Sequence, residues 1–228
     1  MSVSNVAGSN RFGNQTLIGF VYLEAAAEPP PPAPAPNPAP SKNNIPGLPF
    51  TDIYEGDWYA DCAEFAYDYS LFSGTSDSLF SPNMTMTRAM MVQVLYNYEE
   101  PEEASASGFS DVAADAWYAD AVGWAAENDI VSGMGNGRFA PEQNVSREQA
   151  AVILYNYCSY ADFDLPQSKA YLSFSDQSRI SSWAAEAVQF MYCGEVINGR
   201  TDGSFDPGGN ASRAEVASMF MNLLLNAS

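Results

Sequence analysis

Residues 144–157, NVSREQAAVILYNY, have the pattern of an amphipathic helix that begins after Ser146. Apolar residues recur at the spacing of one helical face: Ala150, Ile153, Leu154 and Tyr157. Ser146 and Gln149 form a capping-box pair, which favours a helix start here. Arg147 is unusual, because a cation in the first turn opposes the helix dipole at a cost of up to about 1 kcal/mol. The chain nevertheless places one of only 9 basic residues there, against 28 acidic ones.

The arginine recurs in two other places, in MTRAM (86–90) and ASRAE (211–215). Each copy ends a repeat that starts with Phe-x-Asp, continues through a tryptophan and a glycine-rich turn, and reaches Phe-x-Pro. From the first phenylalanine to the arginine each unit spans 38 or 39 residues, from 50 to 88, 109 to 147 and 174 to 213. Repeats at a fixed period indicate one structural unit used three times.

Each repeat reads as helix, loop and helix. Apolar or small residues recur from each tryptophan at helical spacing, beginning with Trp58 and Cys62, Trp117 and Ala121, and Trp183 and Ala187. The second helices carry a matching stripe and start after Thr87, Ser146 and Ser212. One such pair cannot bury its stripes alone. We therefore predict a mainly α fold in which three units share one core about a pseudo-threefold axis.

This pattern resembles that of surface-layer homology (SLH) domains, which occur in threes at one end of bacterial surface proteins. The resemblance covers residues 49–225, as repeats at 49–100, 108–160 and 173–225. It implies a three-pronged, mostly helical pseudo-trimer that is monomeric. It also implies non-covalent binding of anionic secondary cell-wall polysaccharides, often pyruvylated, in grooves between the prongs. The expected location is extracellular, on the cell wall or surface layer.

The resemblance also implies a set of ligand-binding residues, carried over by motif. They are the Phe-x-Asp aspartates, the tryptophans, one loop glycine per repeat and the arginines: Asp52, Asp111, Asp176, Trp58, Trp117, Trp183, Gly74, Gly133, Gly199, Arg88, Arg147 and Arg213. The first repeat departs most, with Ser78 in place of a second loop glycine and Met90 in place of the motif's acidic residue. Its groove is therefore the weakest candidate.

Each of these residue types also has a purely structural interpretation. The arginines can be read as ion-pair partners, the tryptophans as core residues and the aspartates as caps of a turn before the first helix. The turn glycines are expected to provide positive φ angles and, in addition, to let a ligand approach the backbone closely. The binding interpretation of the arginines adds the free N–H groups of the helix N-terminus to the guanidinium, which together suit a carboxylate or phosphate on a glycan. The repeated phenylalanines are assigned to packing.

Composition excludes several classes of function. A net charge of −19 argues against nucleic acid and anionic membrane surfaces. The chain has no histidine, which removes the commonest general base and metal ligand. RTDGSFD (200–206) lacks the ligand pattern of a calcium loop. Three scattered cysteines indicate buried thiols rather than a disulfide framework. We predict no catalytic residues, cofactor or metal. No run of apolar residues is long enough to insert into a membrane.

The N-terminal part differs from the repeats. Residues 15–23, QTLIGFVYL, favour a β-strand, so residues 1–27 are interpreted as the remnant of an upstream domain. Residues 28–48 are interpreted as a linker, because EPPPPAPAPNPAP (28–40) favours an extended polyproline spacer. The chain is then expected to be the C-terminal part of a longer protein. Two alternatives stay open: the anchoring tail of a surface hydrolase, and a unit for protein–protein docking or self-assembly.

Overall fold

The computed structural model describes residues 44–102, 106–171 and 173–227. In these ranges the chain forms six α-helices and one short 3₁₀ helix: α1 (Ala60–Asp68), α2 (Arg88–Glu99), α3 (Ala119–Glu127), α4 (Arg147–Ala161), η1 (Gln177–Arg179), α5 (Ala185–Cys193) and α6 (Arg213–Asn226). The mainly α fold is confirmed. The interpretations of residues 1–27 and of most of the linker lie outside the described residues.

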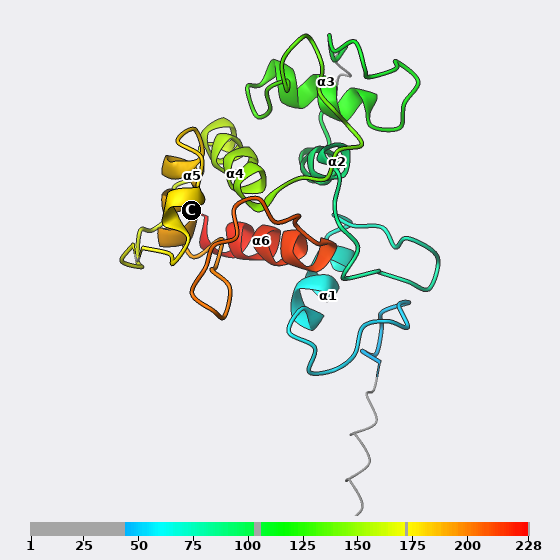
Figure 1. Ribbon diagram of the computed structural model, residues 1–228. Helices are drawn as coiled ribbons and strands as arrows, with labels where there is room; N and C mark the ends of the chain where they lie inside the picture. The colour runs from blue at the N-terminus through cyan, green and yellow to red at the C-terminus, as the bar shows by residue number, and fades with distance from the viewer. Residues whose placement is uncertain (1–43, 103–105, 172, 228) are drawn as a thin grey trace, which may run out of the picture. The chain divides into compact units, whose positions relative to one another are not determined.

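The two helices of one repeat pack mainly against other repeats. In Figure 1, α3 lies beside α2, α5 beside α4, and α1 beside α6, and these are the three close helix pairs. The first helix of each repeat therefore packs on the second helix of the preceding repeat, and repeat 1 packs on repeat 3. This arrangement explains why a single repeat cannot bury its own apolar face. The contacts form a closed cycle; an exact threefold axis stays a prediction.

A ring of backbone hydrogen bonds joins the three repeats just before their second helices. The N–H of Met86 donates to Ala211 at 2.9 Å, that of Ala211 to Val145 at 3.0 Å, and that of Val145 back to Met86 at 2.9 Å. Three antiparallel β-bridges flank the ring: Thr85 with Ser212, Thr87 with Asn144, and Ser146 with Asn210. Each bond joins residues about 60 or more positions apart, so the ring forms only when all three repeats are present.

The second helices start as the capping residues predicted. The side chains of Thr87, Ser146 and Ser212 each accept a hydrogen bond from the third residue of their helix. The capping boxes with Gln149 and Glu215 are both formed.

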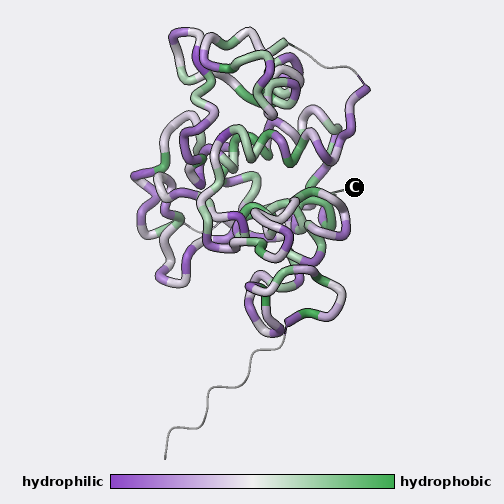
Figure 2. The backbone as a smooth tube through the Cα atoms, turned by 90° about the vertical axis from the view of Figure 1, so that its right-hand side faces the viewer, coloured by the Kyte–Doolittle hydropathy of each residue, from purple (hydrophilic) through white to green (hydrophobic). Residues whose placement is uncertain are grey.

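One core contains residues from all three repeats. Figure 2 shows hydrophobic segments along the helices, with many hydrophilic segments in the loops. The predicted stripes of α4 and α6 are buried, but the α2 stripe ends at Tyr98, which is exposed. Five repeat phenylalanines are buried and Phe109 is half-buried against the core. Cys62, Cys158 and Cys193 are buried free thiols, as predicted.

Candidate functional site: three grooves between repeats

Three cavities of similar size lie at equivalent places, and each is lined by residues of all three repeats. The cavity that we call the Arg213 groove has a volume of about 550 Å³. Gly74 and α2 of repeat 1 form one side, Trp117 comes from repeat 2 and Arg213 from repeat 3. The loop and second helix of one repeat thus meet a tryptophan from the following repeat and an arginine from the preceding one.

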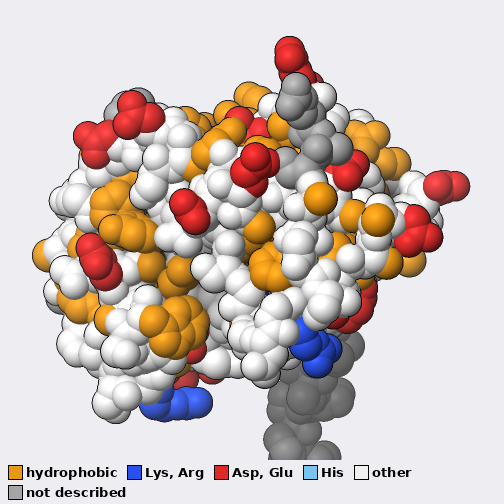
Figure 3. All heavy atoms as spheres, turned by 90° about the horizontal axis from the view of Figure 1, so that it is seen from above, with side chains coloured by type: hydrophobic (Ala, Val, Ile, Leu, Met, Phe, Trp, Pro, Cys, Tyr) orange, Lys and Arg blue, Asp and Glu red, His pale blue; other side chains and the backbone are white. Residues whose placement is uncertain are grey.

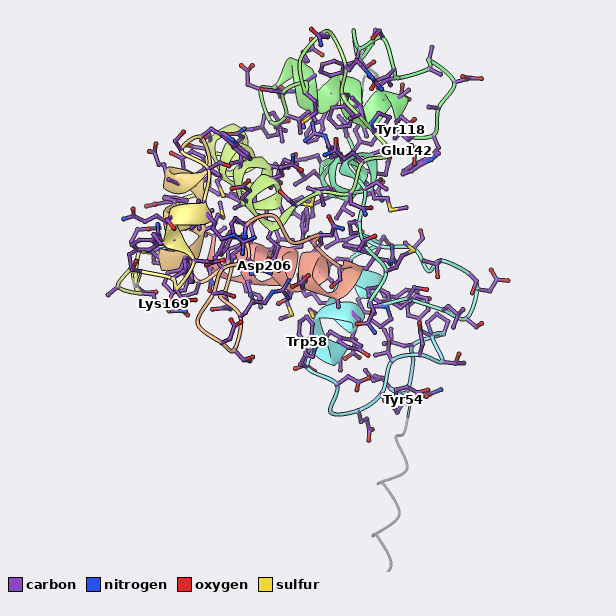
Figure 4. All side chains as sticks on the ribbon, viewed as in Figure 1. Tyr54, Trp58, Tyr118, Glu142, Lys169 and Asp206 are labelled. Atoms are coloured by element: carbon purple, nitrogen blue, oxygen red, sulfur yellow. The ribbon has the colours of Figure 1, made fainter. Side chains whose placement is uncertain are left out.

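The other two cavities have the same construction. The Arg88 groove, of about 490 Å³, combines Arg88 of repeat 1 with Gly133 and α4 of repeat 2 and Trp183 of repeat 3. The Arg147 groove, of about 480 Å³, combines Arg147 of repeat 2 with Gly199 and α6 of repeat 3 and Trp58 of repeat 1. In Figure 4 Trp58 is labelled near the start of α1.

The structure therefore brings together three of the four predicted residue types. Every predicted arginine, glycine and tryptophan lines a groove: Arg88, Arg147, Arg213, Gly74, Gly133, Gly199, Trp58, Trp117 and Trp183. The aspartates line none of the three. Each groove is built from all three repeats. The weak groove that was expected for the first repeat therefore does not correspond to any one of them.

The arginine side chains are almost fully buried where they line the grooves. Arg88, Arg147 and Arg213 are 4%, 3% and 7% exposed. Each guanidinium stacks on the phenylalanine of the next repeat's Phe-x-Pro, and its Nε donates to that phenylalanine's carbonyl oxygen at 2.7–2.9 Å. Each Nη2 donates to a second carbonyl of the same loop, at Ser132, Asn198 or Ser73. The arginines therefore join repeats, whatever else they bind.

Burial affects the ionisation of these arginines. Desolvation lowers the pKa of all three, and that of Arg213 falls to about 10. At neutral pH each guanidinium is still cationic. Because water screens a buried charge weakly, each arginine places a local positive charge beside its groove on a chain with a net charge of −19. On the face shown in Figure 3, acidic side chains are scattered among hydrophobic ones and basic side chains are few.

The helix N-termini are not free to bind an anion, contrary to the expectation above. The backbone N–H of Arg88 donates to Gln143 at 2.9 Å, and the next N–H donates to Pro141 at 3.0 Å. The first two N–H groups of α4 and α6 bind carbonyls of the following repeat in the same way. Of the two kinds of donor expected to bind an anion, only the guanidinium groups therefore stay available in the grooves.

The tryptophans are exposed rather than part of the core. Trp58, Trp117 and Trp183 are 66%, 60% and 57% exposed. Each lies in the turn before its helix rather than on the helical stripe that the sequence suggested. Trp58 and Trp117 rest edge-on against the following tyrosine, with ring centroids 5.4 and 5.0 Å apart. An exposed indole at the wall of a groove offers an apolar, polarisable face on which a sugar ring can stack.

The glycines at the grooves are required for a reason other than the positive φ predicted, which Gly137 and Gly203 of the same turns do have. Gly74, Gly133 and Gly199 do not have positive φ. A Cβ on Gly133 would lie 2.8 Å from the Arg138 carbonyl oxygen and 2.8 Å from the Phe109 ring. The equivalent atoms crowd Gly74 and Gly199. Glycine is therefore needed because the loop folds closely over the phenylalanine of the Phe-x-Asp motif.

The aspartates organise the Phe-x-Pro segments. The two carboxylate oxygens of Asp111 accept hydrogen bonds from the backbone N–H groups of Phe139 at 2.8 Å and Ala140 at 2.9 Å. Asp52 and Asp176 bind the equivalent pairs of N–H groups. The second residue of each pair has positive φ without being glycine: Ser81, Ala140 and Asp206. These carboxylates hold a strained turn and line none of the three grooves. The structural interpretation, in which the aspartates cap a turn before the first helix, is therefore wrong.

One groove position that the sequence interpretation did not assign differs between the grooves. The third residue of each second helix lines a groove: Met90 in the Arg213 groove, Gln149 in the Arg88 groove and Glu215 in the Arg147 groove. Arg200 also lines the Arg147 groove, where the other repeats have Thr75 and Met134. The departure at Met90 was visible in the sequence, but only the fold shows that this position faces a groove.

Other kinds of site find no support in the ranges described. No group of three or more His, Cys, Asp or Glu side chains among these residues could hold a metal ion. None of the described helices is both long and apolar enough to cross a membrane.

Comparison with known proteins agrees with the family resemblance of the three repeats. A family model described as the S-layer homology domain matches residues 49–90, 108–151 and 173–217. An endoglucanase of Bacillus sp. (strain KSM-635) is 33% identical over 184 residues, which is 81% of this chain and 19% of the relative. An exoglucanase, XynX, of Acetivibrio thermocellus is 32% identical over 180 residues, 78% of this chain and 16% of the relative.

A protein named for the surface layer is also among the relatives. The surface-layer 125 kDa protein of Lysinibacillus sphaericus is 30% identical over 164 residues, 70% of this chain and 13% of the relative. The chain thus spans less than a fifth of the length of each of these three relatives.

Proposed function

The chain belongs to the S-layer homology family, whose domains are non-catalytic modules that anchor proteins at the cell surface, and we propose that its three grooves bind anionic cell-wall glycan. Cell-surface anchoring and an extracellular, wall-associated location follow from the family. The finer proposal concerns the ligand: a secondary cell-wall polysaccharide that carries acidic substituents, such as ketal-linked pyruvate.

The observation that carries this proposal is the repeated pairing of an exposed indole with a buried guanidinium in one groove. In the Arg213 groove, Trp117 supplies a stacking surface while Arg213 supplies a cation that water screens poorly. A sugar ring that bears a carboxylate matches both features, because the ring can stack and the acidic group can pair. A neutral glycan would use only the indole.

A second proposal concerns the protein to which the module belongs. Two of the relatives are named as an endoglucanase and an exoglucanase, and this chain matches less than a fifth of each. We propose that an upstream hydrolase domain is one cargo that such a module would hold at the wall. The sequence of the complete gene tests this directly, since a hydrolase domain is either encoded there or is not.

Sedimentation with purified cell-wall sacculi tests glycan binding. Replacing Trp58, Trp117 and Trp183 together with alanine is expected to abolish co-sedimentation without unfolding the chain, because all three are exposed. Sacculi from which pyruvyl groups have been removed are expected to bind the unmodified chain at least about tenfold more weakly, since a desolvated charge pair is lost.

Tyr69 gives a matched control. It is an aromatic residue that is 60% exposed and lines none of the grooves, so Tyr69→Ala is expected to leave co-sedimentation unchanged. Unchanged binding of the triple tryptophan variant, with its fold intact by circular dichroism, would exclude the grooves as the binding site. Binding that depends on the tryptophans and is equally strong with and without pyruvyl groups would retain a glycan site but remove its anionic specificity.

A further inference from the structure

The three grooves are alike in shape but differ in the state of their arginine. In the Arg147 groove, Nη1 of Arg147 donates to Glu215 Oε1 at 2.9 Å. Arg200 approaches the same oxygen with its own Nη1 at 2.6 Å, and its Nη2 lies 3.2 Å from Asp206. With Nε and Nη2 bound to carbonyl oxygens, every nitrogen of the Arg147 guanidinium has an acceptor.

The arginines of the other two grooves keep one nitrogen available. Arg88 and Arg213 use Nε and Nη2 in hydrogen bonds to the next repeat, and their Nη1 atoms have no partner among the described residues. The one buried side-chain nitrogen or oxygen without a partner in the described ranges is Gln93 Oε1. The two Nη1 atoms are therefore accessible to solvent, and both arginines line grooves.

The residue at the third position of the second helix accounts for this difference. Glu215 is an acceptor with a full negative charge and is only 13% exposed in its side chain. Gln149 is neutral and Met90 offers no carboxylate to an arginine. An incoming carboxylate would meet a free cationic donor in two grooves. In the third it would meet two guanidinium groups, those of Arg147 and Arg200, that are already paired with carboxylates. The fixed negative charge of Glu215 beside them costs binding energy for a second carboxylate.

We propose that the grooves are not equivalent: the Arg213 and Arg88 grooves bind an acidic glycan substituent, and Glu215 closes the Arg147 groove to it. The inference rests on the proposed function and specifies which grooves perform it. Glu215 is then a specificity-determining residue that acts as an internal substitute for the ligand's carboxylate. The Arg147 groove keeps Trp58 and a cavity of about 480 Å³, so a neutral sugar can still enter it.

The repeats themselves supply matched variants. Glu215→Gln reproduces in α6 the residue that α4 has at this position, and Gln149 forms a capping box, so the helix start is preserved. Met90→Glu introduces the acidic residue into the Arg213 groove. With Thr87 as N-cap, a glutamate three residues later adds a capping box rather than removing one. One substitution is expected to open a groove and the other to close one.

The tryptophans allow each groove to be observed separately by NMR. Trp58, Trp117 and Trp183 each line a different groove, and the fourth, Trp124, is buried and serves as an internal reference. Their indole N–H signals can be assigned by single Trp→Phe replacements. The probe is a methyl hexopyranoside that carries a 4,6-ketal-linked pyruvate, and the control probe is the same glycoside without pyruvate.

With the acidic probe, the signals of Trp117 and Trp183 are expected to shift and saturate while that of Trp58 does not. Glu215→Gln is expected to strengthen binding at Trp58 by about tenfold or more. Met90→Glu is expected to weaken binding at Trp117 by a similar factor and to leave Trp183 unchanged. Equal saturation of all three signals in the unmodified chain, or a Trp58 signal that ignores Glu215→Gln, would overturn the proposal.

Failure of the proposed function gives a different result. If wall binding survives the triple tryptophan replacement, the grooves are not the glycan site at all. If wall binding needs the tryptophans but no indole signal distinguishes the acidic from the neutral probe, glycan binding stands and the role assigned here to Glu215 is wrong.

Discussion

Nε of Arg213 lies 2.7 Å from the carbonyl oxygen of Phe80, a residue 133 positions earlier in the chain. This bond joins repeat 3 to repeat 1, and the equivalent bonds of Arg88 and Arg147 join repeat 1 to repeat 2 and repeat 2 to repeat 3. The cycle of repeats is closed by the same residues that place positive charge beside the grooves. The proposed glycan binding and the fold therefore depend on shared side chains, and substitutions must separate the two effects.

Replacing Arg213 with alanine is expected to lower the free energy of unfolding by about 3 kcal/mol. The carbonyl oxygens of Phe80 and Ser73 lose their donor, and the guanidinium no longer packs on the Phe80 ring. Urea unfolding followed by circular dichroism measures the change. Arg179→Ala, at an exposed position of η1, serves as control and is expected to change stability by about 0.5 kcal/mol or less. An equally small effect at Arg213 would mean that this bond does not hold the cycle closed.

Asp111→Asn is expected to lower the free energy of unfolding by about 1–2 kcal/mol at neutral pH. The carboxylate accepts from the N–H groups of Phe139 and Ala140 with one oxygen each, whereas an amide has a single, uncharged oxygen acceptor. Desolvation opposes ionisation of Asp111, but the two backbone N–H groups and Arg138 outweigh it and hold the pKa below its ordinary value of 3.8. A carboxyl whose pKa is lowered on folding stabilises the protein above its unfolded pKa.

The difference between the unmodified chain and Asp111→Asn should therefore be constant above about pH 5 and should shrink as the pH falls below 3.8. Urea unfolding at several pH values between neutral and acid provides the measurement. Asp115→Asn, at an exposed site in the same loop, serves as control and is expected to change stability by about 0.5 kcal/mol or less at neutral pH. A stability difference that grows on acidification would reverse the sign and refute the assigned role.

Gly133→Ala is expected to destabilise the chain by about 2–3 kcal/mol, because the new Cβ meets a backbone oxygen and an aromatic ring at 2.8 Å. Neither neighbour is the free end of a flexible side chain, so the loop itself must move. Gly135→Ala is the comparison: it adds a Cβ in open space at φ +96° and is expected to cost about 1 kcal/mol from backbone strain alone. Thermal unfolding of both variants distinguishes crowding from φ preference, and a larger loss at Gly135 would favour φ preference.

The buried cysteines should be unreactive in the folded chain. Burial raises the pKa of the Cys62 thiol to about 11 and that of Cys158 to about 12, from a reference value of 9.0. A thiol reagent at pH 8 is expected to modify all three cysteines in urea and none in buffer. Because these folded pKa values lie above the unfolded one, stability should be unaffected below pH 9 and should fall as the pH rises toward 11. Rapid modification in buffer would contradict the burial of the three thiols.

The local features of the repeats were predictable from sequence because they depend on residues a few positions apart. The caps at Thr87, Ser146 and Ser212 and the start of each second helix at its arginine are settled by one turn of backbone. The three buried thiols were predicted from composition and spacing. The repeat itself identified the family, since the same motif recurs three times in the same register.

The arrangement between repeats was decided by contacts that no local pattern contains. The apolar stripe of α1 gives no sign that α6, about 150 residues later, will cover it. The exposure of the tryptophans, the aspartates' hold on the Phe-x-Pro turns and the crowding at Gly133 all depend on which loop lies over which ring. Periodicity specifies that a face will be buried but not by what, because any apolar surface of suitable shape can bury it. The closed cycle of three repeats determines which helix covers each apolar face, and therefore which residues meet in each groove.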